Sequence, residues 1–232
     1  MPLNNNYEID YAKIIHILLN RDSVLNLIGR NEPALKDIKN GLKIARRFQS
    51  QRGQAISFIG ISKVYLEQEE YVEAREYISN AEKIANEIGE KELMQMVAVS
   101  FGELEIAQLW EHLPGCDLSS LERLSHNYDD VALKLAEELK SKLGRAEALL
   151  LQARIMVEQA SLPVVNSKWQ TANSKWQTAN SKFQEVIVMF EELKQPFEVA
   201  KAYYYYGEAL KHTPRCFVGT PLSRGETHPC PS

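Results

Sequence analysis

Cysteine, proline and glycine are all scarce in this chain of 232 residues, which has three, nine and eleven of them. Three cysteines are an odd number without dense pairing, so we expect free thiols in a reducing cytoplasm rather than a disulfide framework. Prolines and glycines cluster between periodic segments. The remaining composition, with 44% hydrophobic and 25% charged residues, is that of a globular chain.

The chain also lacks an excess of positive charge, long apolar runs and a leader pattern. Its formal net charge of −4 argues against a general nucleic-acid binder, which would need a concentrated basic face. No segment approaches the roughly 18 uninterrupted apolar residues of a membrane span. Residues 1–8 have no basic segment leading into an apolar one, so no secretory signal is expected. We therefore predict a cytoplasmic protein that binds neither nucleic acid nor membrane.

Catalytic, cofactor and metal motifs are missing as well. The five histidines are scattered, no glycine-rich phosphate loop precedes a Lys-Ser or Lys-Thr pair, and no serine elbow or Cys–His motif stands out. The acidic cluster Glu67, Glu69 and Glu70 fits a solvated helix end better than an acid–base pair. We expect no enzymatic activity, no cofactor and no bound metal.

Two charged or metal-ligating sets leave alternatives open. His212, Cys216, His228 and Cys230 are potential zinc ligands, although their spacings are wider than those of compact zinc sites. A basic run could bind an acidic partner or nucleic acid, or could simply be the solvated face of a helix, which is the preferred interpretation. It consists of Lys36, Lys39, Lys43, Arg46 and Arg47.

The chain does contain one regular feature, a fixed number of residues between paired positions that recurs along its length. Four pairs lie 21 residues apart: Gly41 and Ser62, Ala81 and Gly102, Ala136 and Val157, Val186 and Gly207. Four more lie ten apart: Phe48 and Phe58, Ile88 and Ala98, Leu143 and Ala153, Leu193 and Tyr203. A fixed separation that survives changes in the intervening residues indicates a stacked repeat, and periods of this size are typical of solenoids.

Nearly every periodic segment has apolar residues at the three- and four-residue steps of one helical face. One stripe is Ala34, Ile38, Gly41, Ala45 and Phe48, and it returns forty residues later as Ala74, Ile78, Ala81, Ala85 and Ile88. An earlier stripe predicts a helix from Tyr11 to Leu25. We expect the small residues of the 21-residue pairs to let helix backbones approach closely, with looser packing at the bulky exceptions Val157 and Val186.

The stretch Ile61 to Ala81 resembles the tetratricopeptide repeat, with Ile61, Ser62 and Tyr65 followed by Tyr71, Ala74, Ile78 and Ala81. Residues 143–148 and 190–193, followed by 203–210, look like the family's longer variant of about 40 residues, as found in bacterial signalling and regulatory proteins. The proline that usually ends each unit is missing, and Asp129 stands where the family places an alanine. The resemblance covers about residues 10–211. It implies an all-α fold, a right-handed α-solenoid of about four and a half helix hairpins.

This resemblance divides the chain into an N-terminal extension (1–9), a repeat domain (10–211) and a tail (212–232). The repeat units are 12–49, 52–90, 92–144 and 146–194, followed by the half-unit 196–211. The tail has repeated prolines and no helical period, so we expect it to be disordered. Because the array ends on an aromatic face at residues 203–206 instead of a polar cap, we expect a truncated or frame-altered piece of a longer array.

The period breaks at two insertions, both in the turn joining the two helices of a unit, whereas junctions between units stay fixed. The first, between Gly102 and Ala136, includes a possible capping box at Ser119–Glu122. The second contains a heptad, Asn166–Ala172, that recurs at Asn173–Ala179 and begins again at Asn180.

The heptads place Trp169, Trp176 and Phe183 seven residues apart. This spacing fits an aromatic ridge that docks a partner. It also fits a duplication that lengthens one helix and leans its aromatic residues on the neighbouring helix, which we prefer. A coiled coil is disfavoured because sustained signals need three or four heptads.

In tetratricopeptide arrays the first helix of each unit lines a concave groove. Carried over to this sequence, the groove residues are Ile56, Ile59 and Lys63, then Met96, Val99 and Glu103, then Arg154 and Glu158, then Tyr204 and Tyr205. The Lys and Asn set with which some family members hold a peptide carboxylate is absent. The resulting partly apolar groove suits a helical or extended peptide segment. Alternatively, these residues mostly pack against one another.

The function we expect is a non-catalytic interaction module, a scaffold or sensor arm that binds a protein, a peptide or another region of its parent protein. The alternative is a small-ligand-sensing regulatory domain of a larger bacterial signalling ATPase or transcription regulator. In that case a metabolite would lie around Met96, Arg154 and Tyr204. Charged pairs in a closed pocket would favour the sensor, and an open trough would favour a protein partner.

Overall fold

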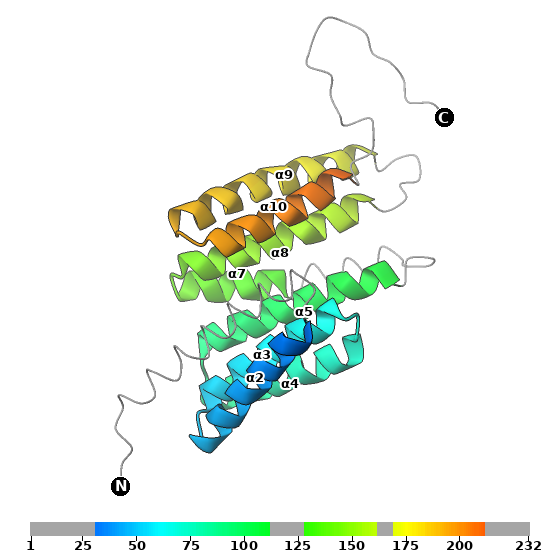
Figure 1. Cartoon of the computed structure of the whole chain (residues 1–232). Coiled ribbons are helices and arrows are strands. Elements are labelled where there is room, and N and C mark those ends of the chain that lie inside the picture. Colours follow the sequence, from blue (N-terminus) through cyan, green and yellow to red (C-terminus); the bar gives the residue numbers. More distant parts are fainter. Residues whose placement is uncertain (1–30, 112–127, 162–168, 212–232) are drawn as a thin grey trace, which may run out of the picture. The chain divides into compact units, whose positions relative to one another are not determined.

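The computed structural model describes residues 31–111, 128–161 and 169–211, and each regular element there is an α-helix (Figure 1). The helices are α2 (Asn31–Arg47), α3 (Gln51–Glu67), α4 (Tyr71–Ile88), α5 (Lys91–Glu111), α7 (Asp129–Glu138), α8 (Lys142–Ser161), α9 (Trp169–Glu192) and α10 (Pro196–Lys211). The chain divides into two compact units, residues 1–151 and 152–232, with the boundary inside α8. The predicted all-α class is confirmed.

Four expectations concern residues outside the described ranges. They are the N-terminal extension, the helix from Tyr11 to Leu25, the capping box at Ser119–Glu122 and the tail from residue 212. All five histidines and all three cysteines also lie outside those ranges.

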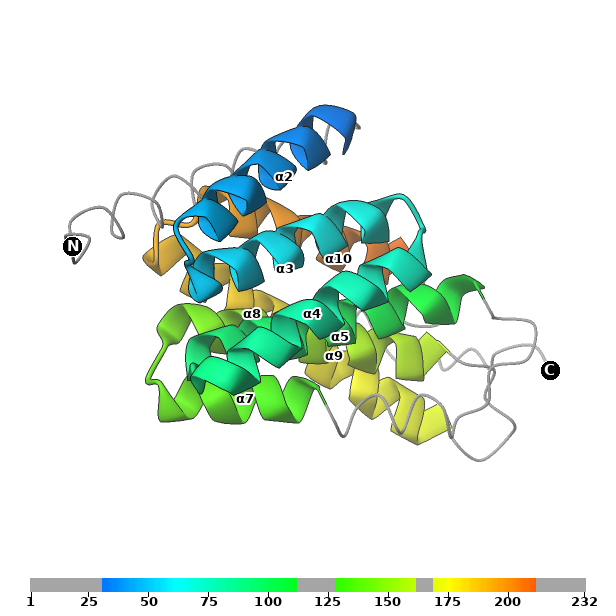
Figure 2. The same ribbon diagram turned by 90° about the horizontal axis from the view of Figure 1, so that it is seen from below.

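Helices of the first unit pack as sequential pairs. The helix α3 packs against α2 and α4, and α5 packs against α4 and α7. In addition α3 and α5, which are not consecutive, contact each other, and Figure 2 shows both alongside α4. The helices α2, α4 and α7 are thus arranged around a shared pair, α3 and α5. In the second unit α9 and α10 pack in the same sequential way.

The core of the first unit consists of the predicted stripes. Ala34, Ile38, Gly41 and Ala45 of α2 are buried, as are Ala74, Ile78, Ala81 and Ala85 of α4. The same hydrophobic cluster contains Ile61 and Val64 of α3 and Leu93 and Leu104 of α5. Burying a valine, leucine or isoleucine side chain stabilises a fold by about 1.5–3 kcal/mol. The larger members of this cluster therefore hold the helices together, and the small residues let them pack closely.

One turn recurs wherever two described helices follow each other directly. Its key residue is left-handed, at φ 51–68°, and is Gln49, Glu69, Gly89, Lys140 or Lys194. The next amide donates to the carbonyl five residues earlier, in the pairs Ser50–Ala45, Glu70–Tyr65, Glu90–Ala85, Ser141–Ala136 and Gln195–Phe190, at 2.9–3.2 Å. This is the Schellman ending of a helix. Four of the five turns adopt it without glycine.

The left-handed residues correct one of the predicted 21-residue pairs, the one that relates α7 to α8. Gly41 and Ser62 lie eight residues before and thirteen after their left-handed residue, and so do the pairs starting at Ala81 and Val186. Counted from Lys140, the third pair is Ala132 and Ala153, not Ala136 and Val157. Likewise Leu139 and Leu149 replace Leu143 and Ala153 in the ten-residue pairs.

The error has a simple physical cause, because residues four apart lie on the same face of a helix. Ala132 and Ala136 are both buried, at 0% and 1% exposed, so burial does not distinguish them. Ala153 is fully buried too. The third pair therefore consists of two small residues, and Val157 is not a bulky exception within it.

The glycines at equivalent places in α5 and α10 have different surroundings. A Cβ on Gly102 would lie 2.6 Å from Cδ2 of the buried Leu151, so this glycine makes room for a side chain of α8. A Cβ on Gly207 would meet no atom within 4 Å. The expectation of close backbone approach was therefore wrong at Gly207.

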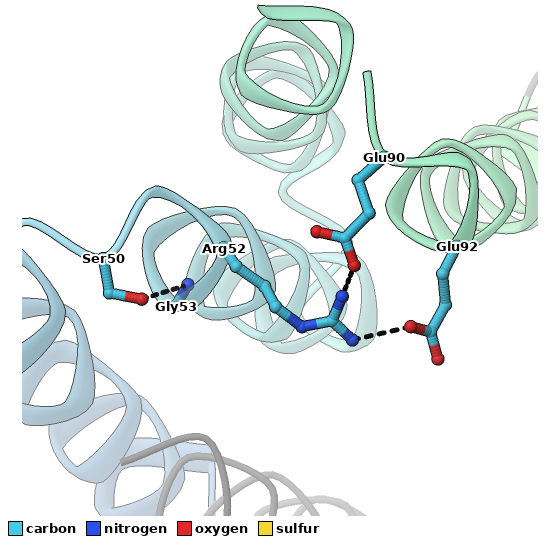
Figure 3. Close-up of polar contacts among 5 residues, drawn as sticks. All are labelled: Ser50, Arg52, Gly53, Glu90 and Glu92. Carbon is cyan, nitrogen blue, oxygen red and sulfur yellow. Dashed lines mark hydrogen bonds and ion pairs between the residues drawn. The ribbon is translucent and has the colours of Figure 1, made fainter. Parts of the chain in front are cut away.

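Polar contacts join the N-terminal ends of α3 and α5 (Figure 3). The Arg52 guanidinium pairs with Glu90, directly before α5, and with Glu92 in its first turn, the latter at 2.7 Å. Ser50 Oγ accepts a hydrogen bond of 3.1 Å from the Gly53 amide and so caps α3. Since Arg52 is partly exposed, each ion pair contributes at most about 1 kcal/mol. These contacts align the two helices at one end.

The helix α9 runs unbroken from Trp169 to Glu192 through the duplicated heptads. Phe183 is buried and stacks on Tyr206 of α10, with ring centroids 5.3 Å apart. This agrees with a duplication that lengthens one helix and packs its aromatic residues on a neighbour. The side chain of Trp169 lies outside the described part of the structure.

The duplication also repeats a contact with α8. The ammonium groups of Lys175 and Lys182, seven residues apart, donate to Oε1 of Gln159 and Gln152 at 2.8 and 3.0 Å. These glutamines are seven apart in the reverse order. The helices α8 and α9 are therefore antiparallel here, and a step of seven residues along α9 corresponds to a step of seven residues along α8.

Candidate functional site

The groove residues predicted on α3 and α5 have unequal exposure. Ile59 and Glu103 are only 2% and 7% exposed, so they present almost no surface. The helices α3 and α5 contact each other and their neighbours α2, α4 and α7, and this packing covers Ile59 and Glu103. The other four, Ile56, Lys63, Met96 and Val99, are half-buried.

Three of these half-buried side chains also contribute to packing. Ile56 and Met96 pack against the core of the first unit, and Val99 packs on the cluster of Ala98, Ala132 and Ala148. In the first unit these predicted groove residues therefore also contribute to the core.

In the second unit the structure brings predicted residues together. The Arg154 guanidinium of α8 lies 3.8 Å from the ring centroid of Tyr205 on α10. Tyr204 meets Tyr205 edge to face, with centroids 5.5 Å apart at 63°. The Lys201 ammonium lies 5.9 Å from the same ring. A cation over an aromatic face is attracted by the ring quadrupole, so Arg154 fixes the position of Tyr205.

Glu158 follows Arg154 by one helical turn and has an altered acidity. Burial raises the pKa of its carboxyl group to about 7, and the nearby Arg154 charge only partly opposes this. Near neutral pH this carboxyl group is therefore partly protonated. The cluster thus combines the Arg154 cation and two aromatic rings with a partly buried acid one helical turn away.

The four consecutive tyrosines of α10 have different environments because successive helical residues point about 100° apart. Tyr203 and Tyr204 are 51% and 60% exposed. Tyr205 lies under Arg154, and the Tyr206 hydroxyl donates to Asn180 Oδ1 of α9. Sequence reasoning placed Tyr204 and Tyr205 in the groove but left out Tyr203, whose exposure depends on what packs against α10.

The charged sets of the sequence lie on the surface. All five residues of the basic run are exposed on α2. Lys39 and Arg46 lie 5.9 and 6.0 Å from the ring centroids of Tyr65 and Phe58 on α3. Glu67, Glu69 and Glu70 are exposed at the turn between α3 and α4. Both arrangements fit solvated helix surfaces.

The described residues contain neither a metal-binding cluster nor a membrane-spanning helix. Across residues 31–111, 128–161 and 169–211, no three or more His, Cys, Asp or Glu side chains are grouped to hold a metal ion. Within the same residues, no helix combines the length and apolarity needed to cross a membrane. The proposed zinc ligands of the tail fall outside these ranges.

In comparisons with known proteins, no family model matches the chain. No curated protein matches it either.

Proposed function

We propose that this chain is a non-catalytic protein-binding module, built as a right-handed α-solenoid of the tetratricopeptide type. The recurrent Schellman turn supports this architecture, because stacked hairpins need the same backbone path at each junction. Contact between α3 and α5 also supports it, since such helices of neighbouring hairpins meet in a stack. The residues quoted from Ile61 to Ala81 add the family resemblance.

The observation that carries the binding proposal is the cluster of Arg154, Tyr204 and Tyr205. Tyrosine and arginine are enriched among the residues that dominate binding energy at interfaces. Arg154 already holds Tyr205 in place, so a partner would not have to order that ring. The exposed ring of Tyr204 beside it offers an apolar anchor.

The partner that fits is a helical or extended peptide segment. One apolar side chain of the peptide would lie on the Tyr204 ring, and the carboxylate of a nearby peptide residue would reach Arg154 or Lys201. A few side-chain anchors of this kind are how grooves recognise such segments. The segment could belong to another protein or to another region of a longer parent protein.

Site-specific photo-crosslinking tests this proposal. The photoreactive residue p-benzoylphenylalanine would replace Tyr204 in one variant and Val72, 78% exposed on α4, in a matched control. We expect cell extract to give a discrete protein adduct with Tyr204→p-benzoylphenylalanine and not with the Val72 variant. A synthetic peptide from the captured segment should then compete for the adduct.

Substitution of Arg154 makes the test specific to the cluster. Arg154→Ala should reduce the Tyr204 adduct, and Arg154→Lys should restore it only in part, because lysine keeps the charge but not the planar stack. Identical adducts from Tyr204 and Val72 would contradict the proposal. So would an adduct that neither Arg154 variant changes in a chain that remains folded by circular dichroism.

A small-ligand sensor is the second candidate, and the Arg154–Glu158 pair is the feature that favours it. A cation beside a partly buried carboxyl group could hold a zwitterionic or acidic metabolite. Thermal unfolding against a metabolite library would reveal such a ligand as a rise in melting temperature. A ligand shift that Arg154→Ala abolishes would favour the sensor over the peptide-binding module.

A further inference from the structure

One side of α10 is exposed and almost uncharged. The residues on it are Pro196, Ala200, Tyr203, Tyr204, Gly207, Leu210 and Lys211, all exposed except the half-buried Gly207. We call this set the α10 face. Lys211 is its single charged member. By contrast, the exposed residues of α4 include Glu73, Arg75, Glu76, Glu82, Lys83 and Glu87. A continuous apolar surface of this kind marks a contact site.

The repeat register shows what happens to this surface elsewhere in the chain. Counted from the left-handed residues Gln49 and Lys194, the positions of Ala200, Tyr203 and Gly207 are held in α3 by Ala55, Phe58 and Ser62. Those three are 0%, 9% and 1% exposed, because α3 is packed against α4 and α5. The α10 face is thus one that this fold covers with another helix.

Gly207 gives independent evidence for an external contact. Glycine is among the least favourable residues inside a helix. Nothing in the described part of the chain requires it here, because no atom of that part lies within 4 Å of the place where a Cβ would stand. Its lack of a side chain leaves a hollow between Tyr203, four residues before it, and Leu210, three residues after it. Small and large residues therefore alternate along the face as Ala200, Tyr203, Gly207 and Leu210.

We propose that two copies of this chain dimerise through the α10 face, with the two α10 helices antiparallel. A two-fold axis that crosses the α10 face at the level of Tyr205 along the helix sets Tyr203 against the partner's Gly207. The same axis sets Leu210 against the partner's Ala200. Each large side chain then enters the space left by a small one, as ridges fit grooves in helix packing. A surface that complements itself in this way is what a two-fold dimer requires.

The size of the face predicts a reversible dimer. A helix of 16 residues is about 24 Å long. A single pair of such helices buries less than the roughly 1,200 Å² at which stable interfaces begin. The second copy is favoured over an unrelated helix because the alternation of large and small residues matches its own antiparallel image.

Sedimentation equilibrium of the full chain over a wide range of concentration tests the dimer. We expect a concentration-dependent shift from monomer to dimer. Tyr203→Ala should raise the dissociation constant of the dimer at least tenfold, because small residues then lie opposite each other. Gly207→Tyr should raise it by a similar factor, because two large residues then lie opposite each other. An equimolar mixture of the two variants should dimerise again, because each position then pairs a tyrosine with a small residue. Val72→Asp on α4 is the control and should sediment like the wild type.

Several outcomes would overturn the proposal. The first is a wild-type chain that stays monomeric at every concentration, and the second is a dimer that neither variant weakens. A third is a mixture that fails to dimerise although both variants are folded by circular dichroism, since this would exclude the antiparallel register. The proposal does not rest on the peptide-binding function. In the Tyr204 photo-crosslinking experiment, self-association is recognised as an adduct of twice the chain mass.

Discussion

Glu158 holds its proton to a higher pH in the folded chain than in the unfolded one. Burial raises the pKa of its carboxyl group from 4.5 to about 7. Between these values the unfolded chain releases the proton first, so the free energy of unfolding falls as the pH rises through this window. The loss is complete above about pH 7. It amounts to no more than about 3.5 kcal/mol, since one pKa unit corresponds to about 1.4 kcal/mol.

We therefore predict that Glu158→Gln stabilises the chain at pH 8 and leaves its stability almost unchanged at pH 4. Glutamine keeps the shape of the side chain but has no charge to desolvate. Urea unfolding of both proteins across this pH range measures the difference. An equal gain at both pH values would show that charge burial is not the cause.

The equivalent residues Gly102 and Gly207 should respond to alanine in opposite ways. Gly102→Ala drives a methyl group into Leu151 and should lower the free energy of unfolding by about 1–3 kcal/mol. Gly207→Ala meets open space and should raise it by about 1 kcal/mol, the difference in helix propensity. Thermal unfolding in dilute, monomeric solution measures both. Leu151→Val should recover part of the Gly102→Ala loss, whereas independent effects would contradict the contact.

We expect the fold to tolerate the loss of one copy of the duplicated heptad of α9. Deleting residues 173–179 gives the same sequence as deleting 166–172, so the remaining copy retains the lysine that bonds Gln159. By the register of the two lysine bonds, Asn173 lies beside Ser161. Residues 162–165 can then join α8 to α9, because helix connections of two to eight residues are common.

We predict that this deletion shifts the melting temperature by only a few degrees, as expected for a change of about 1 kcal/mol or less. Deleting residues 182–188 is the matched control. It removes the buried Phe183, Val186 and Ile187 and should abolish cooperative unfolding. A heptad deletion as damaging as the control would mean that the extra turns of α9 carry contacts the duplication cannot replace.

Elements differ in how far their sequence predicts them. The stripes of α2 and α4 could be predicted because each helix buries one face and exposes the other. The register of α7 and α8 could not, since Ala132 and Ala136 share a buried face and the turn at Lys140 has no glycine to mark it.

The same reasoning applies to the candidate site. The repeat columns placed Arg154 and Tyr205 in one groove, and the structure brings the two side chains together. The column assigned to Arg154 was wrong, because Arg154 lies fourteen residues after the left-handed Lys140, as Lys63 does after Gln49 and Glu208 does after Lys194. The columns were not enough for Ile59 and Glu103, because their burial depends on how α3 and α5 pack against each other and their neighbours. A column predicts which residues are equivalent, but the surrounding helices decide which of them remain exposed.

Across the whole molecule, the repeated turn offers a common route to greater stability. Gln49, Glu69, Lys140 and Lys194 adopt left-handed backbone angles that disfavour residues with a Cβ. Glycine at each place should raise the free energy of unfolding by about 0.5–1 kcal/mol. The four effects should add, because the turns share no hydrogen bonds.

Chemical denaturation of the four single variants and the quadruple variant measures this additivity. Gly89→Ala is the reverse control and should lower stability by about 1 kcal/mol, since its φ of 68° suits glycine. A quadruple variant no more stable than a single one would mean that the turns do not act independently.

The common turn also bears on how such a chain changes length. Residues 50–89 begin directly after the left-handed Gln49 and end at the left-handed Gly89, so both ends of this segment lie in the same kind of turn. Copying or excising this block of DNA as one piece would rejoin the protein in an existing turn, with no new loop to evolve. Arrays joined in this way can gain or lose a hairpin in a single genetic event.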